Sequence, residues 1–177
     1  MSVLETSDFR KGLKIVHNNA PYTVVDFQHV KPGKGNAFTR TKIKNLATGS
    51  VLEITYRSGE KVQGADCEDK TMTFLYNDGD TYHFMDSKTY DQVEFQKDTI
   101  GDGANYILPE MSCDVGFYEG RPLTVEVPNH VELKVSHCEP GVRGDTATNV
   151  TKPATLETGV QVNVPLFISV GDTLKID

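Results

Sequence analysis

Short runs in which apolar and polar residues alternate, separated by turn-forming residues, recur along the chain and constrain its fold most strongly. Val131–Ser136 and Val160–Val164 alternate at every position, which is typical of strands that bury one face of an antiparallel sheet. Thr71–Tyr76 and Thr81–Met85 flank the turn sequence Asn77–Gly79, so we expect a hairpin there. The pattern predicts an all-β protein.

A single short helix is expected to interrupt this pattern of strands. Asp102 has the side chain of a helix N-cap, and Pro109 cannot continue a helix. Between them, Ala104, Ile107 and Leu108 would line one apolar face. The sequence therefore predicts one short helix, capped by Asp102, within an otherwise β region.

Charge is distributed unevenly along the chain and indicates three modules. The net charge is −7 for the whole chain, but +5 for residues 1–64, −10 for residues 65–127 and −2 for residues 128–177. The changes fall at breaks in the strand pattern, in the glycine-containing stretch Ser58–Gly64 and at Val127–Asn129. We therefore predict three small β domains in a row, each a barrel or a sandwich, with these boundaries.

Composition and cysteine spacing exclude several classes of protein. The longest apolar runs, such as Leu166–Ile168, are far shorter than the roughly 20 residues of a membrane-spanning helix. The chain begins without the basic and apolar regions of a signal peptide. Cys67, Cys113 and Cys138 are odd in number and lack Cys-x-x-Cys spacing, which indicates neither a disulfide framework nor a zinc site. We expect a cytoplasmic protein without membrane association, metal or cofactor.

The segment Lys31–Asn36 is expected to form an exposed hairpin tip, because it lies between the strand candidates Tyr22–Val30 and Ala37–Leu46. Its proline fixes one backbone angle, and its two glycines permit conformations closed to other residues. Lys34 would then project from the tip. The alternative is an ordinary solvated turn lysine. A nucleophilic role would need a pKa lowered by burial or a nearby cation, which an exposed tip does not supply.

Three cations occupy every second position of the strand that follows this tip, namely Arg40, Lys42 and Lys44. The period of a strand places them on one face, about 7 Å apart. Together with the lysines of the tip they form the kind of basic surface that grips a phosphate backbone, although a solvated sheet face is the alternative. Phe38 is the single aromatic residue beside them, which favours recognition of shape and phosphate over reading of single-stranded sequence.

The other regions add less specific expectations. The acidic residues 65–127 would be repelled by nucleic acid, so they should face protein or solvent, and the whole charge pattern suits a ribonucleoprotein partner. The long polar stretch Pro140–Thr155 is either a plain connector or a functional loop. No hydrolase, phosphate-loop or dinucleotide motif is present, so no enzymatic activity is expected.

Five segments of the sequence resemble bacterial translation elongation factor P. They occur in the same order over essentially the whole chain and comprise Asp8–Ile15, Val30–Phe38, Tyr76–Gly79, Gly144–Ala147 and Lys152–Gly159. The resemblance implies a KOW-like N-terminal barrel, similar to an SH3 barrel, followed by two OB-fold barrels, arranged in an L that mimics tRNA. It also implies a monomer that binds ribosomal RNA and ribosomal proteins beside peptidyl-tRNA. There the family stimulates peptide-bond formation at consecutive prolines and so relieves stalling.

The resemblance further assigns roles to particular residues. Lys34 corresponds to the tip lysine that a modifying enzyme extends and that reaches the CCA end of peptidyl-tRNA. Its role there is positional, because holding the tRNA in a productive geometry lowers the entropic part of the barrier. The residues implied to contact tRNA or the ribosome are Lys31, Pro32, Gly33, Lys34, Gly35, Arg40, Lys42, Lys44, Gly144, Asp145, Thr146 and Lys152.

The chain departs from the family pattern at one end, and other functions stay open. Family members usually continue past Lys175–Asp177 with a Thr-x-x-Gly-Glu-Tyr-like tail, so we expect the contacts of that tail to be missing. Lys34 argues against the subgroup that carries a rhamnosylated arginine, but it does not choose among lysine extensions. The first alternative function is an RNA-binding OB-fold protein, or a diverged paralogue, without effect on peptidyl transfer. The second is an enzyme that uses Lys34 as a Schiff base.

Overall fold

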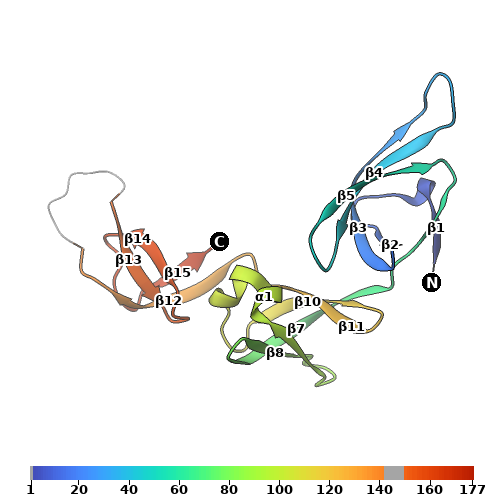
Figure 1. The fold of residues 1–177 in the computed structure, drawn as a ribbon. Helices are drawn as coiled ribbons and strands as arrows, with labels where there is room; N and C mark the ends of the chain where they lie inside the picture. Colours follow the sequence, from blue (N-terminus) through green and yellow to red (C-terminus); the bar gives the residue numbers. More distant parts are fainter. Residues whose placement is uncertain (1, 142–149) are drawn as a thin grey trace. The chain divides into compact units, whose positions relative to one another are not determined.

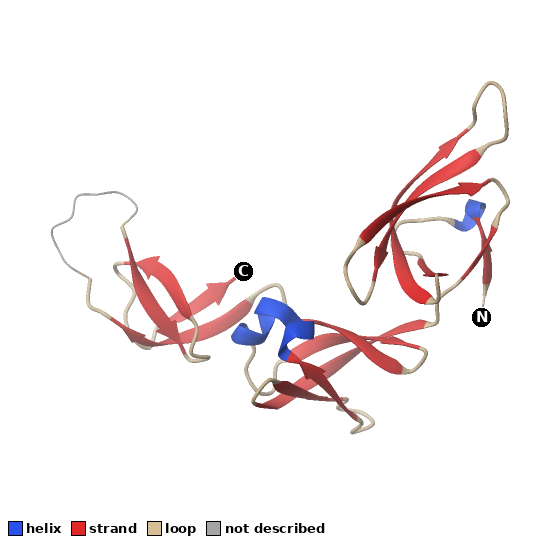
Figure 2. Ribbon diagram, viewed as in Figure 1, coloured by secondary structure: helices blue, strands red, loops and turns tan. Residues whose placement is uncertain are grey.

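Strands make up most of the computed structural model, which describes residues 2–141 and 150–177 (Figures 1 and 2). The all-β class predicted from the alternating pattern is therefore confirmed. Two compact units are present, one formed by Met1–Lys70 with Val115–Thr124 and the other by Thr71–Asp114 with Val125–Asp177. The three-domain division at residues 64 and 127 stays a prediction.

Two sheets surround the core of the N-terminal region. Its elements are β1 (Val3–Glu5), the 3-10 turn η1 (Thr6–Asp8), β2 (Lys14–His17), β3 (Ala20–Val30), β4 (Phe38–Asn45), β5 (Val51–Arg57) and β6 (Lys61–Gln63). The larger sheet has the order β2-β3-β4-β5, and β1 pairs with β6. The buried core consists of Phe9, Leu13, Ile15, Tyr22, Val24, Ile43, Tyr56 and Val62.

One register shift interrupts the antiparallel pairing of β3 with β4. It falls between Val24 and Asp26 and leaves Val25 as the extra residue of a β-bulge. Before the bulge, Val24 is buried in the core, whereas beyond it Phe27 packs against the same core. The inward side chains therefore change from even to odd positions along β3, which a simple alternation of residues does not reveal.

The middle of the chain forms a five-stranded sheet in the order β11-β10-β7-β8-β9. These strands are β7 (Cys67–Asp78), β8 (Thr81–Met85), β9 (Gln92–Gln96), β10 (Ser112–Tyr118) and β11 (Arg121–Glu126). The expected hairpin is confirmed, because β7 pairs with β8 across a turn in which Gly79 has φ +61°. The strands extend farther than the alternating pattern predicts, so the turn begins at Gly79.

The expected helix is present but is built differently. It consists of α1 (Lys97–Ile100) followed by the 3-10 helix η2 (Gly101–Tyr106). Asp102 lies inside η2 and caps no helix, so the predicted N-cap is wrong. The glycine at the start of η2 has φ +78°, which breaks the α-helix there. Ala104 is buried as expected.

The C-terminal region is a four-stranded sheet in the order β14-β13-β12-β15. Its strands are β12 (Val131–Cys138), β13 (Thr151–Leu156), β14 (Gln161–Pro165) and β15 (Thr173–Ile176), and β12 and β14 contain most of the two alternating runs. The buried residues Val131, Leu133, Val135, Ala154, Leu156, Val164 and Ile168 form its core. Tyr106, Leu108 and Met111 pack against this core from the preceding segment.

Two further kinds of feature are absent from residues 2–141 and 150–177. No helix there has both the length and the apolar character needed to cross a bilayer. Within the same residues, no three His, Cys, Asp or Glu side chains come together in a way that could hold a metal ion.

Candidate nucleic-acid interface

The hairpin formed by β3 and β4 presents the predicted tip. The two strands stay paired as far as Val30 and Phe38, and Lys31–Ala37 connects them beyond that last pair. This tip loop projects from the end of the sheet (Figure 1). The two strands predicted on either side of the tip are thus confirmed, with their bounds shifted by one or two residues.

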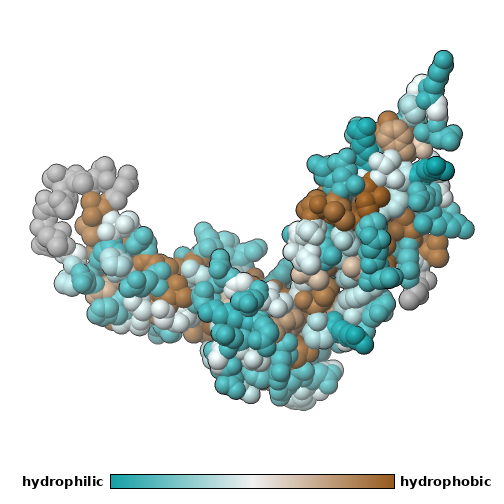
Figure 3. Space-filling model, in the orientation of Figure 1, coloured by the Kyte–Doolittle hydropathy of each residue, from teal (hydrophilic) through white to brown (hydrophobic). Residues whose placement is uncertain are grey.

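Lys34 is exposed at the end of the tip loop. A Cβ added at Gly33 would meet no atom within 4 Å, and Gly35 has φ +109°, so the neighbouring positions supply no side chain to cover it. The Lys34 side chain makes no hydrogen bond or ion pair with any residue that the structure describes. Figure 3 shows hydrophilic atoms at this end of the molecule. The ammonium group is therefore available to a partner.

The three cations of β4 lie on its exposed face, as the strand period predicts. Arg40, Lys42 and Lys44 are exposed, and the residues between them, Thr39, Thr41 and Ile43, are buried. The inward threonines pack into the hydrophobic core side of the sheet. This alternation leaves the charged side chains in solvent on one surface.

Acidic residues on the two neighbouring strands lie beside the middle cation of this basic row, however. Lys42 pairs with Asp26 of β3 on one side and with Glu53 of β5 on the other, so it has an acidic cross-strand neighbour on each side. Asp26 also forms an ion pair of 3.7 Å with Lys11. A shallow hollow of about 220 Å³ on this part of the sheet has a mixed lining for the same reason. Lys42 thus lies between two acidic residues, which strand spacing alone does not reveal.

Beside the tip loop the row ends in a cluster formed by Phe38, Arg40 and Arg57. Phe38 pairs with Arg57 of β5, and the guanidinium carbon of Arg40 lies 5.7 Å from the centroid of the Phe38 ring. Sequence reasoning missed Arg57, because it is distant along the chain. The turn at Ala47–Gly49 between β4 and β5 is the feature that could have predicted this pairing.

On the opposite face of the hairpin, polar side chains fix the strands to each other. His29 Nδ1 and Thr39 Oγ1 form a hydrogen bond of 2.8 Å between paired residues. The rings of Phe27 and His29 are in edge contact, 5.4 Å apart. Thr41 Oγ1 is buried without a hydrogen-bond partner in the described structure. The base of the tip loop is therefore held by both backbone and side-chain contacts.

The residues predicted at the second contact region, in the C-terminal part, are only partly described. Gly144, Asp145 and Thr146 lie outside the described residues. Lys152 lies on β13 and is 7% exposed, and its Nζ donates a hydrogen bond of 2.6 Å to the carbonyl oxygen of Glu139. Its ammonium group thus has a partner within the protein. A direct phosphate contact through Lys152 is not supported by this geometry.

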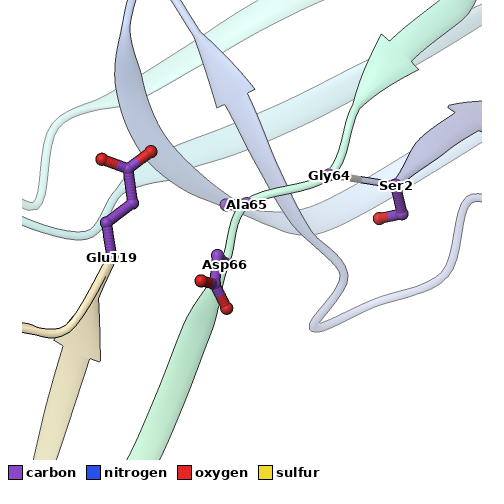
Figure 4. A pocket seen from close by; sticks show the side chains of 5 residues that line it. All are labelled: Ser2, Gly64, Ala65, Asp66 and Glu119. Atoms are coloured by element: carbon purple, nitrogen blue, oxygen red, sulfur yellow. The ribbon is translucent and has the colours of Figure 1, made fainter.

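A second cavity, of about 360 Å³, lies in the N-terminal unit and is lined by Ser2, Gly64, Ala65, Asp66 and Glu119 (Figure 4). The Gly64 amide donates to the Ser2 carbonyl oxygen at 2.8 Å, and the Glu119 amide donates to the Asp66 carbonyl oxygen at 2.9 Å. The two carboxylate side chains point in different directions. They therefore do not converge on a cation.

The cysteines offer no activated nucleophile. Burial, together with a smaller effect of the Asp114 carboxylate, raises the pKa of the Cys113 thiol from 9.0 to about 11. Burial also raises the pKa of the Cys67 thiol, against a smaller opposing effect of Lys14. Because the thiolate is the reactive form, both side chains are poorly suited to nucleophilic chemistry.

Solved structures share the fold of about 70% of the chain. Translation initiation factor 5A from Methanococcus jannaschii superimposes with a TM-score of 0.61 at 21% identity, over 72% of this chain and 94% of its own. A factor of the same kind from Naegleria fowleri gives a TM-score of 0.57 at 13% identity, over 71% of this chain and 98% of its own. The chain thus has the fold of the 5A class of translation factors.

Sequence comparisons identify the family as well as the fold. Three family models match in succession, the elongation factor P KOW-like domain at residues 5–62, the elongation factor P OB domain at residues 67–125 and the elongation factor P C-terminal domain at residues 131–177. Elongation factor P of Moorella thermoacetica is 51% identical over 175 residues, which cover 99% of this chain and 95% of the relative. Elongation factor P of Rhodococcus jostii is 51% identical over 97% of this chain and 92% of the relative. The chain belongs to the elongation factor P family of translation elongation factors.

Proposed function

We propose that this protein binds the ribosome beside peptidyl-tRNA and stimulates peptide-bond formation at consecutive prolines, with Lys34 as the residue that reaches the tRNA. The observation that supports this most directly is the position of Lys34. Its side chain stands at the end of a projecting loop, between two glycines, without any partner among the described residues. The kinship with elongation factor P supplies the translation context.

The proposed action of Lys34 is positional. No acid or base lies in contact with its ammonium group within the described structure, so nothing beside it would assist proton transfer. A cation at the end of a fixed hairpin instead holds an anionic partner in place, and correct alignment of reactants lowers the entropic part of a reaction barrier. The ribosome would then perform the reaction with its substrates better aligned.

We further propose that an enzyme extends Lys34 before the factor acts, and that the factor acts as a monomer in the cytoplasm. The exposure of the tip loop supports the first point, because an enzyme can reach the amine without unfolding any strand. A longer cationic side chain would also increase the reach of the loop. The mass of the peptide that contains Lys34, measured on protein from its native host, tests this step.

The decisive experiment measures the yield of a reporter with three consecutive prolines in a reconstituted translation system. Protein from the native host should rescue this reporter and leave a proline-free reporter unchanged. Lys34→Ala should abolish the rescue, whereas Lys61→Ala, which removes an exposed lysine of β6 in the same region, should not. Equal rescue by the Lys34→Ala protein would contradict the proposal.

The same experiment separates the second candidate function, an RNA-binding protein without effect on peptidyl transfer. The basic surface of β4 supports that alternative. A protein that binds ribosomes but rescues neither reporter would favour it, provided that the mass of the Lys34 peptide shows the modification to be present.

A further inference from the structure

We infer that Phe38, Arg40 and Arg57 form a binding site for one unpaired RNA nucleotide at the base of the tip loop, with its base stacked on the Arg40 guanidinium and its phosphate at Arg57. This inference rests on the proposed function only in placing RNA at this face of the protein. The three residues lie on the exposed surface where β4 and β5 pair, next to the Lys31–Ala37 loop.

The first support for this site is the position of Arg40 over an aromatic ring. Its guanidinium carbon lies 5.7 Å from the centroid of the Phe38 ring, two residues away on the same face of β4. Contact with the ring limits the orientations of a side chain that is otherwise long and flexible, and the planar guanidinium group can stack on a ring with one face and on a nucleobase with the other. A lysine in this position would supply charge but no plane.

The second support is the strand register, which places Arg57 beside the same ring. Phe38 pairs directly with Arg57, and Arg40 pairs with Thr55. Arg40 and Arg57 are therefore diagonal neighbours, with Cα atoms about 7–8 Å apart. That separation is comparable to the distance between a base and the phosphate of its own nucleotide, so one nucleotide can reach both guanidinium groups.

The third support is that neither of these two cations is paired with a carboxylate in the described part of the chain. The closest cross-strand acids, Asp26 and Glu53, are only diagonal neighbours of Arg40. Within residues 2–141 and 150–177, neither the Arg40 nor the Arg57 side chain forms an ion pair. Glu60 is close to Arg57, but its Oε2 accepts a hydrogen bond of 2.8 Å from the backbone amide of Arg57. This carboxylate therefore binds the backbone of the turn and not the guanidinium group. Lys42, by contrast, stands between Asp26 and Glu53.

These contacts recognise the chemistry of a nucleotide without reading its sequence. Stacking on a guanidinium plane requires an exposed base face, which every unpaired base offers and a base inside a duplex does not. The phosphate contact at Arg57 is electrostatic and independent of sequence. The site therefore distinguishes unpaired from paired RNA, which a plain basic stripe does not do.

The test uses the full chain and two RNA probes, a fluorescein-labelled hexacytidylate and a fluorescein-labelled blunt-ended RNA duplex that is long enough to stay paired. Fluorescence anisotropy gives Kd for each probe over a series of salt concentrations. Protein in which Lys34 is unmodified can be used for this binding measurement, because the inferred site does not include Lys34. We expect tighter binding of the single strand than of the duplex.

Three variants separate stacking from charge. Arg40→Lys keeps the charge but loses the plane, so it should weaken binding of hexacytidylate by about tenfold with an unchanged salt dependence. Arg57→Gln should lower the slope of log K against log salt by about 0.7, the value for one phosphate contact on a single strand. Phe38→Leu removes the ring that orients Arg40, so it should also weaken binding of hexacytidylate. Arg121→Gln, which removes an exposed arginine of β11, is the matched control and should change nothing.

The inference is overturned if Arg40→Lys binds hexacytidylate like the unaltered protein, or if the duplex binds as tightly as the single strand. Its failure is separable from failure of the proposed function, because the proline reporter is measured independently. Rescue of the reporter with unaltered RNA binding in all three variants would reject the nucleotide site alone. Loss of RNA binding in the variants without any reporter rescue by the parent protein would reject the proposed function alone.

Discussion

Lys152 Nζ donates a hydrogen bond of 2.6 Å to the carbonyl oxygen of Glu139, and this contact joins the end of β12 to the start of β13. A hydrogen bond from a charged donor is stronger than one between neutral groups. Because the Lys152 side chain is only 7% exposed, water cannot easily replace this acceptor. The lysine is thus part of the structure of the C-terminal sheet.

Lys152→Ala should therefore destabilise the C-terminal region. It removes a charge-assisted hydrogen bond and leaves the Glu139 carbonyl without that donor, and such losses cost about 1.5–3 kcal/mol. Urea denaturation measures the change. Lys175→Ala removes an exposed lysine of β15 in the same sheet and should cost less than about 0.5 kcal/mol. Equal effects of the two substitutions would show that the Lys152 contact is not structural.

Two buried threonines of β4 should respond in opposite directions to replacement by valine. Thr39 Oγ1 is hydrogen-bonded to His29, so Thr39→Val should cost about 1 kcal/mol. Thr41 Oγ1 is buried without a partner in the described structure, so Thr41→Val removes an unsatisfied polar group and should stabilise the protein by about 1 kcal/mol. Urea titration followed by the amide NMR signals of residues 2–63 measures both. A destabilising Thr41→Val would reveal an acceptor for this hydroxyl.

Two glycines should differ sharply in their tolerance of alanine. A Cβ at Gly103 would lie 2.4 Å from Val127 Cγ2 and 3.2 Å from Val127 Cγ1, and a β-branched side chain has little rotational freedom to withdraw. Gly103→Ala should therefore cost about 1–3 kcal/mol. Gly33→Ala meets nothing within 4 Å and should leave the melting temperature unchanged. Thermal denaturation followed by circular dichroism measures both melting temperatures. Equal melting temperatures for the two variants would contradict this prediction.

Stability should fall at alkaline pH through Cys113. Burial, and then Asp114, raises the pKa of its thiol from 9.0 to about 11 in the folded protein. Below pH 9 the thiol is protonated in both states. Between pH 9 and about 11 the unfolded chain loses this proton while the folded protein keeps it, so the free energy of unfolding falls by about 1.4 kcal/mol per pH unit.

Cys113→Ala should lack this part of the decline. The measurement is the free energy of unfolding of both proteins at several values between about pH 8 and pH 11, with the difference plotted against pH. Raised tyrosine pKa values, at Tyr56 and Tyr118, add to the decline at the upper end in both proteins and therefore cancel in the difference. A difference that stays constant with pH would contradict the expected pKa of the thiol.

Much of the fold follows from local patterns in the sequence. The strands of the C-terminal sheet are visible as alternating runs because each has one buried face, and the β7–β8 hairpin is visible because Gly79 marks its turn. The tip loop was located for the same reason, since two strands flank a segment rich in glycine and lysine. In each case residues close together in sequence determine the feature.

The features that were missed depend on contacts between distant residues. Arg57 joins the site through the register of β5 on β4, and Asp26 and Glu53 become neighbours of Lys42 through the registers on both of its sides. The burial of Lys152 depends on the carbonyl oxygen of Glu139. The residue type of Asp102 predicts a helix cap, but the strand β9 leads directly into α1 at Lys97. Pairing register and strand length decide these points, and neither is local.

The bulge at Val25 sets which side of the hairpin faces outward. Beyond this extra residue, Phe27 and His29 turn toward the core face while Gln28 shares the outer face with Arg40. If β3 kept all its residues but paired regularly, without the bulge, Asp26 and Gln28 would turn toward the core and Phe27 and His29 toward solvent. The single surplus residue in β3 thereby decides which side chains of the outer hairpin are buried and which are exposed below the tip loop.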